Sequence, residues 1–124
     1  MTTRITTPEA TTYTIDATDR TLGRVASEAA HALLGKRSVH FAKNQALPVT
    51  VVINNASKLH LPSRRTKGKV YTHYTGYPGG LREIRMDVMI EKKGIADVVT
   101  KTVDGMIPRN RLRAPRMKNL IVNA

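Results

Sequence analysis

The sequence contains no cysteine and few acidic side chains. Without thiols the chain forms neither a disulfide nor a thiolate zinc site, and it has no cysteine nucleophile, a pattern that fits a reducing compartment. No apolar run approaches the roughly 20 residues that a membrane-spanning helix requires. Residues 1–12 include no hydrophobic segment typical of a secretory signal. We therefore expect a cytoplasmic protein without a membrane partner, in which residues 1–12 form a flexible threonine-rich arm.

Patterns typical of catalysis or metal binding are also missing. His40 and His60 have no companion at metal-ligand spacing, so we expect no metal site. The sequence has no pair of carboxylates and no serine beside an evident base, so nothing in it indicates an active site. The glycine-containing stretch 76–80 matches neither common phosphate-binding loop. We expect no enzyme, no cofactor and no small-molecule substrate. The alternative of a nucleotide-binding enzyme would be favoured by a micromolar, magnesium-dependent affinity for a mononucleotide.

The scarcity of acids leaves a large positive charge. Against 9 Asp and Glu stand 21 Lys and Arg, which gives a formal net charge of +12. The excess lies mainly in residues 61–124, with fourteen basic and five acidic side chains, against seven and four in residues 1–60. So many positive charges attract polyanions and also repel one another within the protein. A permanent nucleic-acid partner would neutralise them, so the composition favours such a partner. The length of 124 residues is enough for one domain with its own core.

Aromatic residues are few, and three of the four tyrosines fall in the segment Lys69–Arg82. This segment also holds three of the eight glycines, and it follows a basic stretch that includes Arg64, Arg65 and Lys67. Flat rings stack on unpaired bases, basic side chains contact phosphates, and glycine lets a backbone come close to a bulky partner. The combination predicts RNA binding.

Hydrophobic periodicity predicts an α/β domain over residues 13–104. The run 49–53 is almost entirely β-branched, which is typical of a buried strand in a parallel sheet. Gly35 stands where a left-handed residue would end the first helix, and Met86, Met89 and Met106 are expected in the core. We expect strands at 13–17, 49–53, 59–61 and 70–75, and helices from Thr21 to Gly35, over 86–93 and over 95–103.

Residues 105–124 contain five basic side chains and no acid. Pro108 and Pro115 limit continuous helix, so we expect a basic C-terminal arm packed on the domain and on RNA. Some of these arginines could instead pair with Asp97 or Asp104, but two carboxylates cannot satisfy five cations.

Four segments carry a resemblance to a known family. They are TLGRVASE (21–28), VVINNASK (51–58), YTHYTGYPGGL (71–81) and VDGMIPRNRL (103–112). Their order and spacing resemble the L-thirteen family of large-subunit ribosomal proteins in its bacterial form, over residues 13–122. The resemblance implies a three-layer α/β/α fold with a mainly parallel central sheet and a basic C-terminal arm. It also implies a structural role: binding large-subunit rRNA early in assembly beside neighbouring large-subunit proteins, with magnesium present only as an rRNA-associated ion.

The resemblance places Tyr74, Gly76, Gly79 and Gly80 against the rRNA backbone. Departures from the family include the replacement of an acidic turn by Lys43–Pro48 and the absence of a histidine-rich tail, so we expect a shortened form. A free RNA-binding regulator of messages is an alternative that sedimentation with the large subunit would test. The full set of residues that we expect at the rRNA is Arg24, Lys36, Arg37, Arg64, Arg65, Lys67, Lys69, Tyr71, His73, Tyr74, Gly76, Tyr77, Gly79, Gly80, Arg82, Arg109, Asn110, Arg111, Arg113, Arg116 and Lys118.

Overall fold

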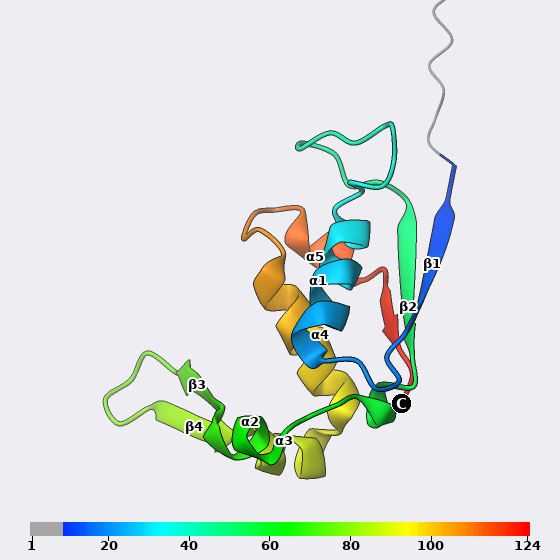
Figure 1. Cartoon of the computed structure of the whole chain (residues 1–124). Helices are drawn as coiled ribbons and strands as arrows, with labels where there is room; N and C mark the ends of the chain where they lie inside the picture. Colours follow the sequence, from blue (N-terminus) through cyan, green and yellow to red (C-terminus); the bar gives the residue numbers. More distant parts are fainter. Residues whose placement is uncertain (1–8) are drawn as a thin grey trace, which may run out of the picture.

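The computed structural model describes residues 9–124, which form a parallel sheet, a group of helices and a projecting hairpin (Figure 1). In chain order the elements are β1 (Thr11–Asp16), α1 (Leu22–Leu33), β2 (Val49–Asn54), a short 3-10 helix (Ala56–Lys58), α2 (Ser63–Gly68), β3 (Val70–Tyr74), β4 (Leu81–Arg85), α3 (Met86–Lys93), α4 (Ile95–Met106), α5 (Arg113–Met117) and β5 (Leu120–Val122).

The main sheet is entirely parallel, with the order β1-β2-β5. Its central strand β2 pairs Val51 with Tyr13 of β1 on one side and with Leu120 of β5 on the other. Val51 and Ile53 are fully buried, as the β-branched run predicts. The expected α/β class with a mainly parallel sheet is confirmed.

Helices α1 and α4 pack against each other and lie on one face of this sheet (Figure 1). Their buried stripes include Val25 and Leu33 of α1 and Val99 of α4. The other face of the sheet carries Thr14 and Ile121, both exposed. Among residues 9–124, the helical cover therefore lies on a single face, so the third layer of the expected three-layer α/β/α arrangement is not found in this part of the chain.

The first helix begins and ends where the sequence indicates. Thr21, with an extended backbone, precedes α1, and Gly35 has a φ of 82°. The backbone conformation favours glycine there, and a Cβ on Gly35 would also come within 2.6 Å of the end of the Leu47 side chain, which would have to shift. Helices α3 and α4 meet at Gly94 as expected. Met86 and Met89 are buried, but the prediction for Met106 is wrong: it is 42% exposed because Ile107 takes the core position at the end of α4.

The strand predicted at 70–75 is β3, shortened to Val70–Tyr74, and it does not join the main sheet. It pairs antiparallel with β4, which the charged sequence LREIR did not reveal, and the two strands form the projecting hairpin (Figure 1). The strand predicted at 59–61 is wrong: the structure has only a single bridge between His60 and Thr21. Helix α2 was not anticipated either.

The C-terminal segment contributes to the sheet. Pro115 lies in the first turn of the short helix α5, where its missing N–H has no intrahelical acceptor to lose. Strand β5 then follows and pairs with the central strand. The boundary expected after residue 104 falls inside α4. The expected N-terminal arm lies partly outside the described residues, and its last two residues, Thr11 and Thr12, already belong to β1. None of the described helices is long and apolar enough to cross a membrane.

Candidate nucleic-acid interface

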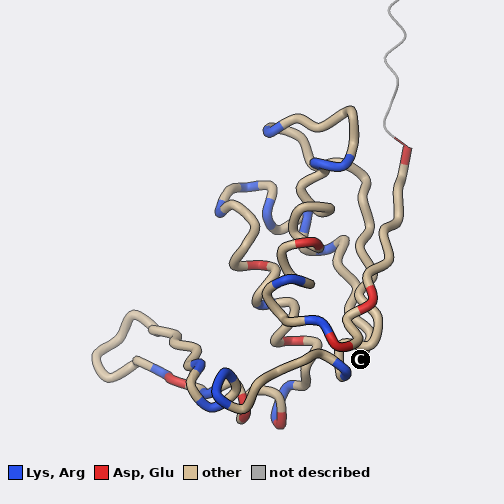
Figure 2. Tube along the Cα trace, viewed as in Figure 1, with Lys and Arg blue, Asp and Glu red and all other residues tan. Residues whose placement is uncertain are grey.

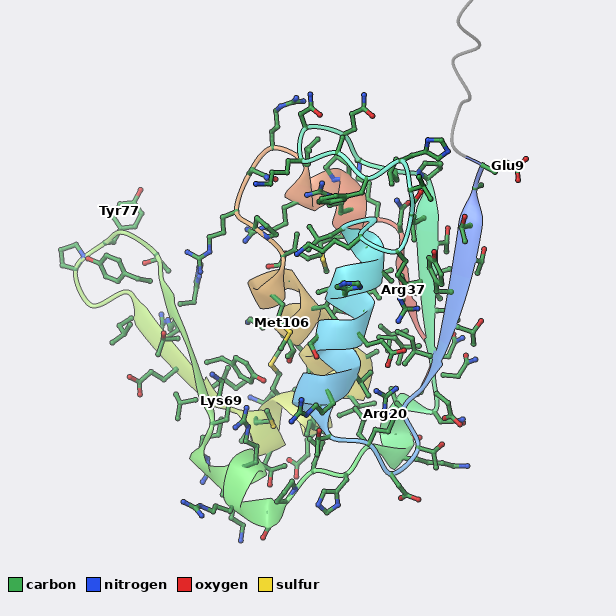
Figure 3. The ribbon with its side chains drawn as sticks, turned by 45° about the horizontal axis from the view of Figure 1, so that its top comes forward. Glu9, Arg20, Arg37, Lys69, Tyr77 and Met106 are labelled. Atoms are coloured by element: carbon green, nitrogen blue, oxygen red, sulfur yellow. The ribbon has the colours of Figure 1, made fainter. Side chains whose placement is uncertain are left out.

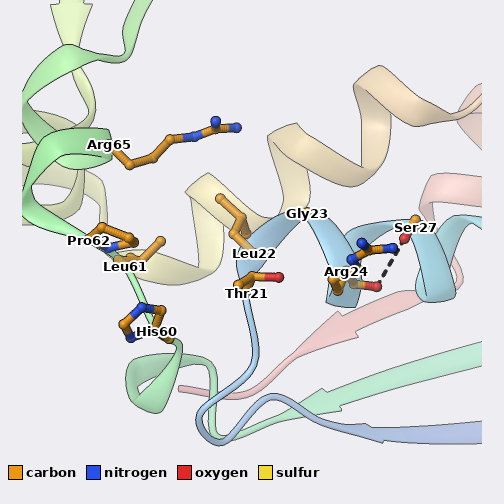
Figure 4. A pocket seen from close by; sticks show the side chains of 9 residues that line it. All are labelled: Thr21, Leu22, Gly23, Arg24, Ser27, His60, Leu61, Pro62 and Arg65. Carbon is orange, nitrogen blue, oxygen red and sulfur yellow. Dashed lines mark hydrogen bonds between the residues drawn. The ribbon is translucent and has the colours of Figure 1, made fainter.

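One hollow lies between the start of α1 and helix α2, and a second hollow adjoins it along α2. The first, of about 440 Å³, is drawn in Figure 4, and the second, of about 500 Å³, shares Pro62 and Arg65 with it. We call the two hollows together the α1–α2 groove. It is lined by Thr21, Leu22, Gly23, Arg24, Ser27, His60, Leu61, Pro62, Arg64, Arg65, Gly68 and Lys69. Four of these are basic and none is acidic; Arg24, Arg64, Arg65 and Lys69 are named the groove cations below.

Local structure brings the two helix starts together. The backbone N–H of His60 donates to the carbonyl of Arg20 over 2.9 Å, which holds the segment before α2 beside the start of α1. The Pro62 carbonyl accepts the first hydrogen bonds of α2, from Arg65 and Thr66. In Figure 4 the Arg65 side chain reaches from α2 toward α1. Groups far apart in sequence therefore share one groove.

The start of α1 adds positive potential to the groove. The Thr21 side chain makes no capping hydrogen bond, and the first turn of α1 contains no acid. The amide N–H groups of a first helical turn lack intrahelical acceptors, and the helix dipole is positive at this end. Backbone and side chains in this groove thus carry the same sign of charge.

Arginines beside the sheet are already paired within the protein. Arg20 and Arg37 contact Glu28 at 2.7 Å and 3.3 Å, and these contacts, with the hydrogen bond from Arg20 first, lower the pKa of Glu28. The Arg37 guanidinium also lies over the Tyr13 ring, 5.0 Å from its centroid. Arg37, expected at the rRNA, therefore contacts other side chains of the protein, although it is exposed like its neighbour Lys36.

Tyr71 lies on the side of the hairpin that packs against the body. The Lys69 and Lys101 ammonium groups lie 5.6 Å and 5.1 Å from the centroid of its ring, and burial raises the pKa of its hydroxyl. Lys101 comes from α4 and was missed by sequence reasoning, because nothing in the chain relates position 101 to a strand thirty residues earlier. On this strand His73 shares the face of Tyr71, and Tyr74 lies on the opposite face.

The three glycines of the hairpin loop are needed for different structural reasons. Gly76 and Gly79 have φ values of 89° and 73°, and a Cβ on either would meet nothing within 4 Å. A Cβ on Gly80 would collide with the Thr75 hydroxyl and lie 2.9 Å from the Tyr77 carbonyl oxygen. The expectation was that all three glycines make room for rRNA. For Gly80, the loop itself already requires glycine.

We expect Gly80→Ala to loosen the hairpin loop in the free protein, because the added methyl group forces the Tyr77 carbonyl away. In amide hydrogen exchange, Thr75 and Gly80, which bond across the loop, should exchange at least about tenfold faster, which corresponds to roughly 1.4 kcal/mol of local stability. Amides of β2 should be unchanged. The matched variant Gly79→Ala adds only the conformational cost of a positive φ, because its methyl group meets no other atom. Faster exchange in Gly79→Ala but not in Gly80→Ala would contradict the conclusion that the loop requires glycine at position 80.

A second group of predicted residues lies near the opposite end of α1. Arg109, Asn110 and Arg111 are exposed in the loop after α4, where Figure 2 shows basic residues gathered, as it does along α2. The Asn110 side chain accepts a hydrogen bond from the Leu112 amide over 3.1 Å and shapes this loop. The remaining exposed side chains of the predicted set are Lys67, His73, Tyr74, Tyr77, Arg82 and Lys118.

Two predicted cations of the C-terminal segment face the protein. Arg113 pairs with Asp104 at 3.4 Å, the internal alternative raised by the sequence. Arg116 is only 2% exposed, and its Nη2 donates to the Gln45 carbonyl over 3.3 Å. As folded, Arg116 cannot meet a phosphate at the surface, because α5 directs its side chain inward beneath the loop that contains Gln45. That prediction is corrected.

Comparisons with known proteins agree with the resemblance. The family model described as Ribosomal protein L13 matches residues 10–124. The large ribosomal subunit protein uL13 of Chlamydia caviae is 40% identical over 108 residues, which cover 87% of this chain and 71% of that protein. Its counterpart in Geobacter sulfurreducens is 39% identical over 112 residues, covering 90% and 78%. That of Hahella chejuensis is 38% identical over the same length with the same coverage.

Proposed function

Since the chain belongs to the ribosomal protein L13 family, we propose that it binds large-subunit rRNA through the α1–α2 groove. The family is a structural, non-enzymatic component of the large ribosomal subunit, so this chain is a ribosomal protein and not an enzyme. The proposal adds that it holds its rRNA segment in place during early assembly, next to neighbouring large-subunit proteins.

One observation carries the proposal: four cations and no acid line two hollows that share a wall. A third hollow, along α3 to α5, includes Asp97 and Asp104 beside Lys93 and Lys101, and its charges cancel. Phosphates are attracted where uncompensated cations cluster, and arginine binds phosphate oxygens in pairs. The α1–α2 groove is therefore the better path for an RNA backbone.

The body-facing side of the hairpin extends this interface. Tyr71 with Lys69 and Lys101, and the neighbouring His73 and Arg82 on the same face, offer rings for stacking and cations for phosphates. Exposed Tyr77 at the tip offers a further stacking surface. Magnesium ions would accompany the rRNA; within residues 9–124 no cluster of acidic or histidine side chains could hold one.

Salt dependence tests this proposal directly. With on the order of eight phosphate contacts, affinity for a protein-free large-subunit rRNA fragment should fall about a thousandfold or more between roughly 50 and 200 mM salt, because each contact releases counterions. The measurement is a binding titration at several salt concentrations. A nearly flat response would rule out a binding mode based on the basic groove. Absence of the protein from sedimented large subunits would favour the alternative of a free regulator of messages.

A further inference from the structure

The hairpin has a second face that points away from the body. In the antiparallel register Val70 lies opposite Arg85, Thr72 opposite Glu83, and Tyr74 opposite Leu81. Directly opposed residues lie on the same side of a two-stranded sheet, and so do alternate residues along each strand. We call these six residues the outer hairpin face. Its apolar members are well exposed: Val70 to 42%, Tyr74 to 60% and Leu81 to 56%.

The opposite side of the hairpin is partly covered by the protein itself. Tyr71 and Ile84 are half-buried against the core, and Tyr71 lies beside Lys101 of α4. The hairpin is thus anchored through one face, while the other face carries three exposed large apolar side chains. Figure 3 shows the projecting hairpin, with Tyr77 at its tip. A grouping of exposed apolar side chains on one face is typical of a protein-binding site.

The charges on the outer hairpin face argue against RNA as its partner. Glu83 lies at the centre of this face, and within residues 9–124 no Lys or Arg comes within 4 Å of its carboxylate. Arg85 is partly neutralised by Asp87 at 3.5 Å. An unpaired carboxylate repels phosphates, and of the three exposed apolar side chains only Tyr74 has a ring, while Val70 and Leu81 are aliphatic. The one unpaired charge instead attracts a cation.

We propose that the outer hairpin face docks a segment of a neighbouring large-subunit protein. That segment places an apolar side chain between Tyr74 and Leu81 and a Lys or Arg against Glu83. A two-stranded hairpin alone is only marginally stable, so cover on its second face also holds the RNA-facing side in place. Tyr74, expected from the family resemblance to lie against the rRNA backbone, is reassigned here to protein contact. The inference rests on the proposed function, because the neighbour is met within the subunit.

Photocrosslinking tests the two faces separately. A photoreactive benzoylphenylalanine is placed at Leu81 in one full-length protein and at His73 in another, and each is assembled into large subunits and irradiated. We expect Leu81 to yield a protein adduct and His73 an rRNA adduct. An rRNA adduct at Leu81, or none, would overturn the docking proposal. Failure of the His73 adduct alone would count against the RNA-facing assignment and leave the docking proposal standing.

Charge reversal supplies a second, independent readout. In competition with the native protein during subunit reconstitution, Glu83→Lys should be incorporated at least about tenfold less well, because like charges meet across the contact. Its affinity for protein-free rRNA should not fall. Glu91→Lys, at an exposed position on α3, makes the same change in net charge and should incorporate equally with the native chain. Equal incorporation of both variants would overturn the proposal.

Discussion

Replacing all four groove cations with glutamine is expected to weaken binding to protein-free large-subunit rRNA about a thousandfold at roughly 0.1 M salt. The slope of log affinity against log salt should also become shallower by about three, since each lost phosphate contact removes roughly 0.7 to 0.9. The physical reason is local: these side chains share one groove with no acid to offset them. A binding titration over several salt concentrations measures both quantities.

A matched variant separates the groove from the overall charge of the protein. Four exposed lysines outside the groove are changed to glutamine, which lowers the net charge by the same amount. We expect at most about a tenfold loss of affinity in this control, because nonlocal attraction is screened within roughly 10 Å at 0.1 M salt. Equal losses in both variants would mean that only total charge matters. The control positions are Lys43, Lys58, Lys92 and Lys93.

Arg116→Met is expected to stabilise the free protein by about 1–3 kcal/mol, which raises the Tm by several degrees. The Arg116 guanidinium is buried and stays charged at any ordinary pH. Its Nε has no hydrogen-bond partner, and among residues 9–124 no carboxylate lies within 4 Å. Methionine fills a similar volume without the cost of desolvating a charge, at the loss of one long hydrogen bond to Gln45.

Thermal and denaturant unfolding measure this change directly. Arg109→Met removes the same charge from an exposed loop position and should shift the free energy of unfolding by no more than about 0.5 kcal/mol. A lower Tm for Arg116→Met than for the native chain would show that the buried guanidinium is satisfied, for example by bound water. In that case Arg116 would be a structural anchor for the loop that contains Gln45.

Most elements of the body follow from local patterns in the chain. The stripe of Val25, Ala29 and Leu33 predicts α1, because burial on one face imposes the helical period on the apolar residues. The β-branched run before Asn54 predicts a buried parallel strand, because strands of such sheets are continuously apolar. Gly35 and Gly94 mark helix ends for a reason that is equally local. The family follows from four motifs whose order the chain preserves.

The hairpin partner β4 and the sheet strand β5 are short and carry no such period. They become strands because β3 and β2 offer them hydrogen-bonding partners, and pairing depends on which edges meet in space. No local pattern distinguishes them from loop.

For the candidate interface, too, part follows from the sequence and part only from the tertiary structure. Composition alone places the basic and tyrosine-rich residues near RNA. The tertiary structure then decides which of them share a surface. Arg24 and Arg65, some forty positions apart, line the same hollow, Lys101 lies beside Tyr71, and Arg116 is buried. The chemistry of a side chain determines what it can bind and is read from the sequence. Its neighbours and its exposure depend on contacts between distant parts of the chain.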